Sequence, residues 1–220
     1  MIEAIFFDND GVLVDTEGHY LEANQIVFEE HGHVLDREAF IEISLKQGRS
    51  VFDLIRARGA SEDTVMALRS RRDVIYRERV ARGVAVYDGA GETLAALGEH
   101  YPMAIVTSAL RLDFELAHRD TGLLRHFEFV LASGEYKRHK PHPDPYLEAA
   151  ERLGVDPGRC VVVEDSVRGL HAAVAAGMAC LAIPHDLTAD GDFSQAAAVL
   201  SSIRDVPGAV SRIARAMTAG

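Results

Sequence analysis

The feature that most constrains this chain is an apolar run that ends in two acidic residues and a glycine. Residues 4–7 are apolar, and Asp8-Asn9-Asp10-Gly11 follows them directly. Such a run predicts a strand buried on both faces, because a half-exposed strand would alternate polar and apolar residues. Asp8 would then lie at the carboxyl end of the strand, where open α/β sheets bind ligands. If the extended backbone continues to Asp10, the two carboxylates project to one side and can hold a hard cation.

Four further apolar runs predict the rest of a sheet. They cover residues 103–106, 129–131, 160–163 and 180–183, and helical patterns separate them. Strands that alternate with helices indicate a parallel sheet with right-handed crossovers, which is a Rossmann-like, doubly wound α/β fold. If strands 2 and 3 lie on one side of strand 1 and strands 4 and 5 on the other, the order is 3-2-1-4-5. The switch in that order, where ligands bind, lies beside strand 1.

A long helical stretch interrupts this alternation. Residues 16–86 show helical spacing over 19–30, 37–45, 51–58 and 61–80, with no convincing strand between them. We therefore predict a helical domain at 16–86, inserted into a Rossmann-like core made of 1–15 and 87–220. Residues 49–82 hold nine arginines against five acidic residues, although the whole chain carries a net charge of -11. This local excess of positive charge can attract an anionic small molecule.

Polar residues follow the predicted strands at the edge where Asp8 is expected. Thr107-Ser108 follow the second strand, and a hydroxyl beside a helix start suits the capture of phosphate together with free backbone N–H groups. Lys140-Pro141 stand in a proline-rich loop after the third strand, and Glu164-Asp165-Ser166 follow the fourth. Mg²⁺ prefers octahedral oxygen ligation, so Asp8, Asp165 and a backbone carbonyl could hold it and leave positions for water and phosphate.

The stretch from Asp8 to Glu17, with Asp8-x-Asp10-Gly11-Val12 and Asp15-Thr16-Glu17, closely resembles the first motif of haloacid-dehalogenase-superfamily phosphatases. With the three later stretches included, the resemblance extends over essentially the whole chain. It implies Mg²⁺-dependent hydrolysis of a small phosphorylated metabolite, such as a sugar phosphate, through an aspartyl phosphate. In this family a helical insertion, as in the β-phosphoglucomutase-like subgroup, is a mobile cap domain that closes over the active site and selects the substrate.

The resemblance also implies a role for each motif residue. Asp8 would be the nucleophile and a metal ligand, and Asp10 would be the general acid and base as well as a metal ligand through its backbone carbonyl. Lys140 would also be catalytic, because it would neutralise charge between the nucleophile and the phosphoryl group. The other residues would bind phosphate or metal: the backbone N–H of Asn9, Thr107, Ser108 and Lys140 for phosphate, and Asp165 with a supporting Glu164 for Mg²⁺. Position 9 departs from the family pattern, in which apolar or aromatic residues are commoner.

Substrate contacts from the helical domain are less well marked in the sequence. Arg49 stands in Lys46-Gln47-Gly48-Arg49-Ser50, a break between helices where an arginine can clamp a second anionic or hydroxyl group of a substrate. In β-phosphoglucomutase-like members, residues of the corresponding loop contact the substrate. The resemblance therefore adds Lys46, His19 and Tyr20 to the candidates.

Three alternative functions use similar residues. A β-phosphoglucomutase-like mutase would return the phosphoryl group to a sugar, but such enzymes place histidine where this chain has Tyr20, so His19 would have to replace it. A haloacid dehalogenase shares the aspartate nucleophile but lacks the second acid and the metal, so Asp10 and Asp165 argue against it. A phospho-accepting signalling domain combines similar groups on a shorter chain that has no place for the insertion.

Length and composition limit the number of domains and the classes of partner that this protein can have. A length of 220 residues fits one large or two small domains, and no apolar segment approaches the roughly 20 residues that span a bilayer. The start of the chain leads into a strand without a basic signal region, and Cys160 and Cys180 are expected to be buried, reduced thiols. We therefore expect a cytoplasmic enzyme with no membrane partner. The net charge of -11 opposes binding to nucleic acid. Both a monomer and a homodimer are compatible with this sequence. Several phosphorylated metabolites are compatible with it as substrates.

Overall fold

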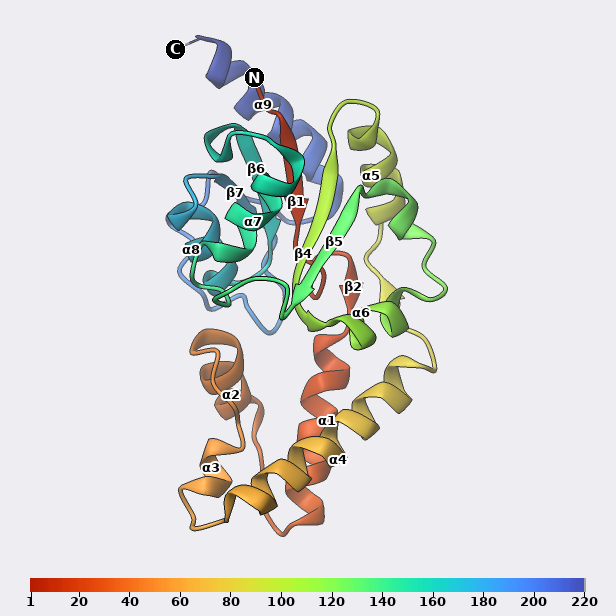
Figure 1. The fold of residues 1–220 in the computed structure, drawn as a ribbon, viewed down its shortest axis with the longest axis vertical. Coiled ribbons are helices and arrows are strands. Elements are labelled where there is room, and N and C mark those ends of the chain that lie inside the picture. Colours follow the sequence, from red (N-terminus) through yellow and green to blue (C-terminus); the bar gives the residue numbers. More distant parts are fainter. Residues whose placement is uncertain (220) are drawn as a thin grey trace. The chain divides into compact units, whose positions relative to one another are not determined.

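The computed structural model describes residues 1–219, which form two compact units (Figure 1). The first, here called the core unit, consists of Met1–Asp15 and the chain from Ala85 onward. The second, here called the helical unit, is Thr16–Val84. The chain therefore leaves the core unit shortly after its first strand and returns to it about seventy residues later.

A six-stranded parallel sheet lies at the centre of the core unit, among the residues that the structure describes. Its order is β5-β4-β1-β6-β7-β8, with the bounds Phe129–Ser133, Met103–Leu110, Ala4–Phe7, Cys160–Glu164, Ala179–Ala182 and Ala198–Val199. The first five strands confirm the predicted order. Strand β8 was not predicted, because two residues carry no periodicity that distinguishes a strand from a loop.

Both faces of this sheet are covered by helices, which is why its central strand lacks polar residues. Alternate residues of β1 enter two hydrophobic clusters: Ile5 and Phe7 pack in one and Ala4 and Phe6 in the other. The first cluster includes residues of α5 (Ala90–Gly98), α6 (Arg111–His118) and α9 (Val206–Ala219). The second includes residues of α7 (Asp144–Leu153) and α8 (Val167–Ala175). Figure 1 shows this layered arrangement of helix, sheet and helix.

Several smaller elements complete the core unit. A two-stranded antiparallel ribbon pairs β2 (Val14–Asp15) with β3 (Ala85–Val86), the two segments that flank the helical unit. Short 3₁₀ turns span Leu123–His126, Pro157–Arg159 and Ile203–Asp205. One boundary differs from the sequence-based expectation. Strand β4 continues through Thr107 and Ser108 to Leu110.

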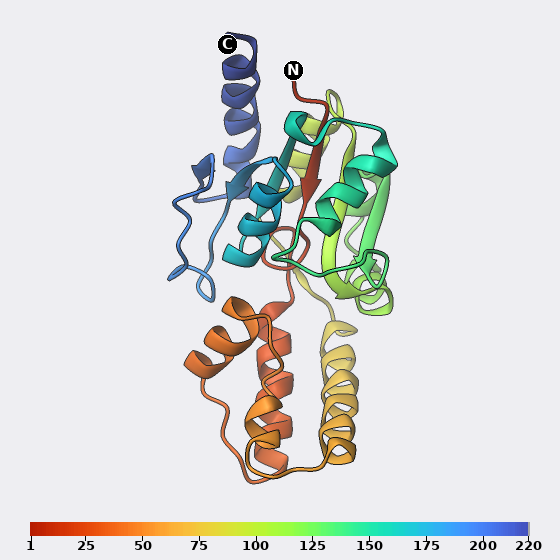
Figure 2. The same cartoon turned by 60° about the vertical axis from the view of Figure 1, so that its left-hand side comes forward.

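The helical unit is formed around two long helices, α1 (Glu17–Glu30) and α4 (Glu62–Val80), which pack against each other (Figure 2). The shorter α2 (Arg37–Phe40), a π-helical turn at Ile41–Lys46 and α3 (Asp53–Arg56) connect them. Ser61 caps α4 by accepting a 3.2 Å hydrogen bond from the backbone N of Thr64, which satisfies one free N–H of the first turn.

Two expectations about the whole chain can be compared with the structure. Cys160 and Cys180 are both buried and free, as predicted. Burial raises the pKa of the Cys160 thiol to about 12 and that of Cys180 well above its ordinary value, which favours the neutral thiol over the nucleophilic thiolate. Within residues 1–219, no helix combines the length and the apolar character that crossing a bilayer requires.

Candidate active site

Segments far apart in the sequence bring Asp8, Lys140 and Glu164 together at the carboxyl end of the sheet. Asp8 follows β1, and its backbone N donates to the carbonyl of Val163 in β6 at 2.9 Å, which continues the sheet pairing by one residue. Lys140 comes from the loop before α7, and its Nζ lies 2.6 Å from Asp8 Oδ1 and 2.7 Å from Glu164 Oε1. The three side chains are buried, so these ion pairs are shielded from water.

The Glu164 carboxylate accepts hydrogen bonds from two hydroxyl groups as well as from Lys140. The hydroxyl of Tyr146 in α7 donates to its Oε1 at 2.8 Å, and the hydroxyl of Ser166 donates to its Oε2 at 3.0 Å. Burial by itself raises the pKa of Glu164, but the charge and hydrogen bond of Lys140 outweigh it and hold that pKa below its ordinary value. Glu164 is therefore a fixed anion, positioned by partners from the loop before α7, from α7 and from the start of α8.

The electrostatic setting of Asp8 differs from that of Glu164. Burial raises the pKa of Asp8, Lys140 lowers it, and the neighbouring negative charges of Glu164 and Asp10 raise it again, to about 8. One lysine thus contacts two buried carboxylates. The pKa of Glu164 is lowered and that of Asp8 is raised, so Glu164 is the more readily ionised of the two. A further positive charge beside Asp8 would stabilise its anionic form.

The cluster extends to a third carboxylate. Asp8, Glu164 and Asp165 each offer an oxygen, and these oxygens lie within 4.8 Å of one another. All three residues are buried, and Lys140 supplies a single positive charge against them. A group of closely spaced carboxylate oxygens is the donor set that a hard divalent cation requires, so these residues could hold a metal ion.

Asp10 is held separately, by a residue of β4. The Thr107 hydroxyl donates to Asp10 Oδ2 at 3.2 Å, and it accepts a 3.0 Å hydrogen bond from the backbone N of Ala109. The hydroxyl of Tyr136 fixes the same strand by donating to the Thr107 carbonyl at 3.0 Å. Thr107 is fully buried, whereas Ser108 is exposed. The two hydroxyls that the sequence placed together therefore point into different surroundings.

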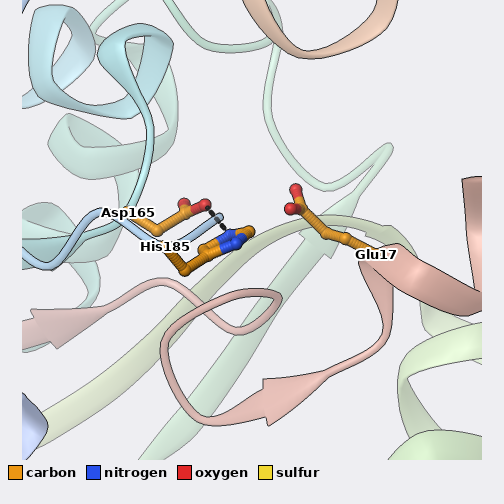
Figure 3. A group of neighbouring side chains, drawn as sticks. All are labelled: Glu17, Asp165 and His185. Carbon is orange, nitrogen blue, oxygen red and sulfur yellow. Dashed lines mark hydrogen bonds and ion pairs between the residues drawn. The ribbon is translucent and has the colours of Figure 1, made fainter. Parts of the chain in front are cut away.

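Asp165 has a partner that sequence reasoning missed. His185, in the segment after β7, lies with its Nε2 3.0 Å from Asp165 Oδ2 (Figure 3). A Cβ atom at Gly11 would stand 2.6 Å from the same Asp165 oxygen and 2.7 Å from the His185 nitrogen. Gly11 also has a φ of 80°, so glycine is required there by both space and conformation. The only signal for His185 in the sequence is its place shortly after a predicted strand.

Asn9, between Asp8 and Asp10, is fully buried. Four other candidates lie in the helical unit, where the structure gives three of them partners from that unit. The Tyr20 hydroxyl is hydrogen-bonded to Arg72, and its ring packs edge-on against Tyr76 at 5.5 Å between centroids. Lys46 pairs with Glu42 at 3.7 Å, and the exposed Arg49 pairs with Asp53 at 3.1 Å. The fourth, His19, lies in the first turn of α1 and is partly buried.

Comparison with known proteins identifies the family. The sequence profile described as haloacid dehalogenase-like hydrolase matches residues 5–183. The chain is 33% identical over 194 residues to the phosphatase-named protein YhcW of Bacillus subtilis (strain 168), with 86% of each chain covered. It is 31% identical over 183 residues to the 6-phosphogluconate phosphatase of Escherichia coli (strain K12), with 80% of each covered.

Solved structures agree with these relatives. The chain is similar to CbbY from Rhodobacter sphaeroides, solved in complex with phosphate, with a TM-score of 0.82 and 27% identity over 94% of this chain and 96% of that one. A mutant of the same protein has been solved with xylulose-(1,5)bisphosphate. The family profile, which matches residues 5–183, includes the ends of the two strands that carry the buried carboxylates, β1 and β6. The chain belongs to the haloacid dehalogenase-like hydrolases and is a hydrolase of phosphate esters.

Proposed function

We propose that this protein is a Mg²⁺-dependent phosphatase that hydrolyses a sugar phosphate through an aspartyl phosphate on Asp8. The observation that carries the proposal is the buried contact between Asp8 and Lys140 beside two further carboxylates. A carboxylate is repelled by an anionic ester unless positive charge lies close to both. The relative named 6-phosphogluconate phosphatase and the solved structure with a sugar bisphosphate support a phosphorylated carbohydrate as the substrate.

The residues present fit a magnesium ion. We propose that Asp8, Asp165 and the backbone carbonyl of Asp10 bind it, with Glu164 in support. The three clustered carboxylates are oxygen donors, and no cysteine among the described residues belongs to the cluster, so the donor set favours a hard cation. When bound, Mg²⁺ would offset the negative charge of the carboxylates and of the phosphate.

In the first half of the proposed reaction, a carboxylate oxygen of Asp8 attacks phosphorus opposite the ester oxygen. A bond forms between Asp8 and phosphorus as the bond from phosphorus to the ester oxygen breaks, and Asp10 gives its proton to the leaving oxygen. Lys140 reduces the repulsion between nucleophile and phosphate. Thr107, Ser108 and the backbone N–H of Asn9 would hold the phosphoryl oxygens.

In the second half, the acyl phosphate is hydrolysed. Asp10, now a carboxylate, removes a proton from water, the resulting hydroxide oxygen attacks phosphorus, and the bond to Asp8 breaks to release inorganic phosphate. Asp10 is protonated again and Asp8 is again a carboxylate, so the catalyst is regenerated. The Thr107 hydroxyl, which donates to Asp10 Oδ2, would keep this side chain in place through both steps.

We further propose that the helical unit selects the substrate. Arg49 is the best candidate within it, because its side chain is 60% exposed and its ion pair with Asp53 can exchange for another anion at little cost. Lys46 is similarly exposed and paired. The Tyr20 hydroxyl, in contrast, already bonds Arg72, a residue that is 9% exposed, which favours a packing role for Tyr20. His19 remains a candidate for contact with a sugar hydroxyl.

Phosphate release tests this function. The purified chain, stripped with EDTA, would be assayed on a panel of phosphorylated sugars and sugar acids, with and without Mg²⁺. We expect hydrolysis that depends on Mg²⁺ and is abolished in Asp8→Asn, which keeps the shape of the side chain but loses the nucleophilic anion. Near-normal turnover by Asp8→Asn would contradict an aspartyl phosphate. Isomerised sugar phosphate without net phosphate release would instead identify a mutase.

A further inference from the structure

Asn9, the residue between the two motif aspartates, makes a contact that the proposed reaction does not explain. Its side-chain Oδ1 lies 2.6 Å from Nε2 of His118, at the end of α6 and 109 positions further along the chain. Asn9 is fully buried and His118 is 3% exposed. A polar pair at this depth is informative, because burying an amide or an imidazole without a partner is costly.

His118 is itself held in one orientation. Its Nδ1 lies 3.0 Å from the Thr121 hydroxyl, and its ring packs against Phe114 with the centroids 4.5 Å apart. Burial lowers the pKa of His118 to about 4, so the ring is neutral near pH 7 and has one N–H. That N–H can donate to Asn9 Oδ1 while Nδ1 accepts from Thr121.

This contact anchors the turn that carries the aspartates. The Asn9 carbonyl accepts hydrogen bonds from the backbone N of Leu13 at 2.9 Å and of Val14 at 3.2 Å, so Asn9 organises the turn after Asp10. Within residues 1–219 the Nδ2 of Asn9 has no hydrogen-bond partner. The hydrogen bond to His118 is therefore the polar contact that fixes the Asn9 side chain. It thereby also fixes the backbone of Asn9, which links Asp8 to Asp10.

The strand and helix that supply His118 also hold Asp10. Thr107 of β4 donates to Asp10 Oδ2, and α6, which begins directly after β4, carries His118. The turn is thus held by two side chains from one strand–helix segment, one bound to Asp10 and the other to Asn9. A change at either contact shifts the turn relative to β4, and small displacements of reacting groups lower turnover strongly.

We propose that His118 is a positioning residue, which acts through the Asn9 side chain to fix the orientation of Asp8 and Asp10 for phosphoryl transfer. This inference rests on the proposed function, since its main readout is hydrolysis of a phosphate ester. It adds a residue of α6 to those that control the rate. His118 is 3% exposed and its ring nitrogens contact Asn9 and Thr121, so we expect its loss to affect kcat far more than KM.

Two substitutions at position 118 separate positioning from packing. His118→Gln keeps an N–H donor near the place of Nε2, whereas His118→Leu keeps a similar volume without a donor. At a temperature well below unfolding for every variant, we expect His118→Leu to lower kcat about tenfold, with KM within about twofold of the wild-type value. His118→Gln should recover most of the lost kcat.

A double-mutant cycle with Asn9→Leu tests whether the two residues act through one contact. We expect the double variant to lose no more kcat than either single variant, since each single change already breaks the same bond. Thr93→Val is the matched control. Thr93 is buried in α5 and donates to the Ile203 carbonyl at 3.2 Å, so its loss should lower stability but leave kcat unchanged.

The outcomes distinguish this inference from the proposed function. If the wild-type protein hydrolyses no phosphate ester, the proposed function fails before any variant is compared. If the wild-type protein is active but folded His118→Leu retains its kcat, the positioning role is wrong. Losses that multiply in the double variant would also overturn it, because they would show that Asn9 and His118 act independently.

Discussion

Asp10 is the residue at which geometry and chemistry can be separated most cleanly. In the wild-type protein Thr107 Oγ1 lies 3.2 Å from Asp10 Oδ2. Asp10→Asn keeps an oxygen that can accept this hydrogen bond, but it removes the group that exchanges a proton. We expect kcat to fall by about 10²- to 10⁴-fold, the usual contribution of general acid–base catalysis, with little change in KM. Steady-state phosphate release measures both constants.

The exposed Asp120 provides a control for this substitution. Its carboxylate pairs with its neighbour Arg119 at 3.1 Å and has 80% side-chain exposure. Asp120→Asn makes the same chemical change away from the buried carboxylates, so kcat should remain at the wild-type value. Equal, small losses in the two variants would contradict an acid–base role for Asp10.

The pH dependence of stability should report the burial of His118. Because the folded pKa, about 4, is below the ordinary value of 6.5, the folded protein binds fewer protons than the unfolded chain between these values. The stabilisation is complete above pH 6.5 and is lost as pH falls toward 4. Between pH 7.5 and pH 5, His118 should account for a loss of up to about 2 kcal/mol in the free energy of unfolding.

Urea titrations at these two pH values would measure that loss. His118→Gln has no titrating group at this position, so its free energy of unfolding should fall less than that of the wild-type protein over the same interval. The difference between the two falls is the quantity of interest, since other groups titrate equally in both. An identical fall would mean that His118 titrates with its ordinary pKa in the folded protein.

Among the elements, α8 packs so closely against the candidate active site that one of its positions has no room for a side chain. A methyl group on Gly169 would overlap the Glu164 carboxylate, which Lys140 and Tyr146 hold in place. We expect Gly169→Ala to destabilise the protein by about 1–3 kcal/mol, the usual cost of overpacking. Turnover should fall as well, because Glu164 can move only by losing those hydrogen bonds.

Gly91 in α5 is the matched control for Gly169. A Cβ atom there would have Leu123 Cδ2 as a neighbour at 4.0 Å, which is an ordinary contact. Because alanine is favoured over glycine within a helix by about 0.5–1 kcal/mol, Gly91→Ala should raise stability slightly and leave turnover unchanged. Urea unfolding of both variants measures the contrast, and similar effects at the two positions would show that Glu164 can rearrange freely.

For the whole molecule, metal binding should raise the free energy of unfolding and the melting temperature. A ligand that binds the folded state stabilises it by about 2.7 kcal/mol when its concentration is a hundredfold above its Kd. We expect Mg²⁺ to raise the melting temperature of EDTA-treated protein, and Asp165→Asn to remove most of that rise. The measurement requires no substrate. An equal rise in Asp165→Asn would mean that Mg²⁺ binds elsewhere.

The sequence predicted the sheet and the carboxylate cluster because both depend on local patterns. Apolar runs identified five strands, and the polar residues at their ends had to meet at one edge once those strands were parallel. Asp8, Lys140, Glu164 and Asp165 lie together in the structure, while their catalytic and metal-binding roles stay predictions. The role of the helical unit in substrate choice also stays a prediction.

Only the tertiary structure revealed the partners of these groups. The bond from Asn9 to His118 spans 109 positions and that from His185 to Asp165 spans 20, and neither histidine belongs to a pattern that a sequence displays. Strand β8 likewise forms because β7 offers it an edge. Strand and helix periodicity comes from backbone geometry and can be read locally, whereas a buried polar pair depends on which side chains the finished packing brings within hydrogen-bond distance.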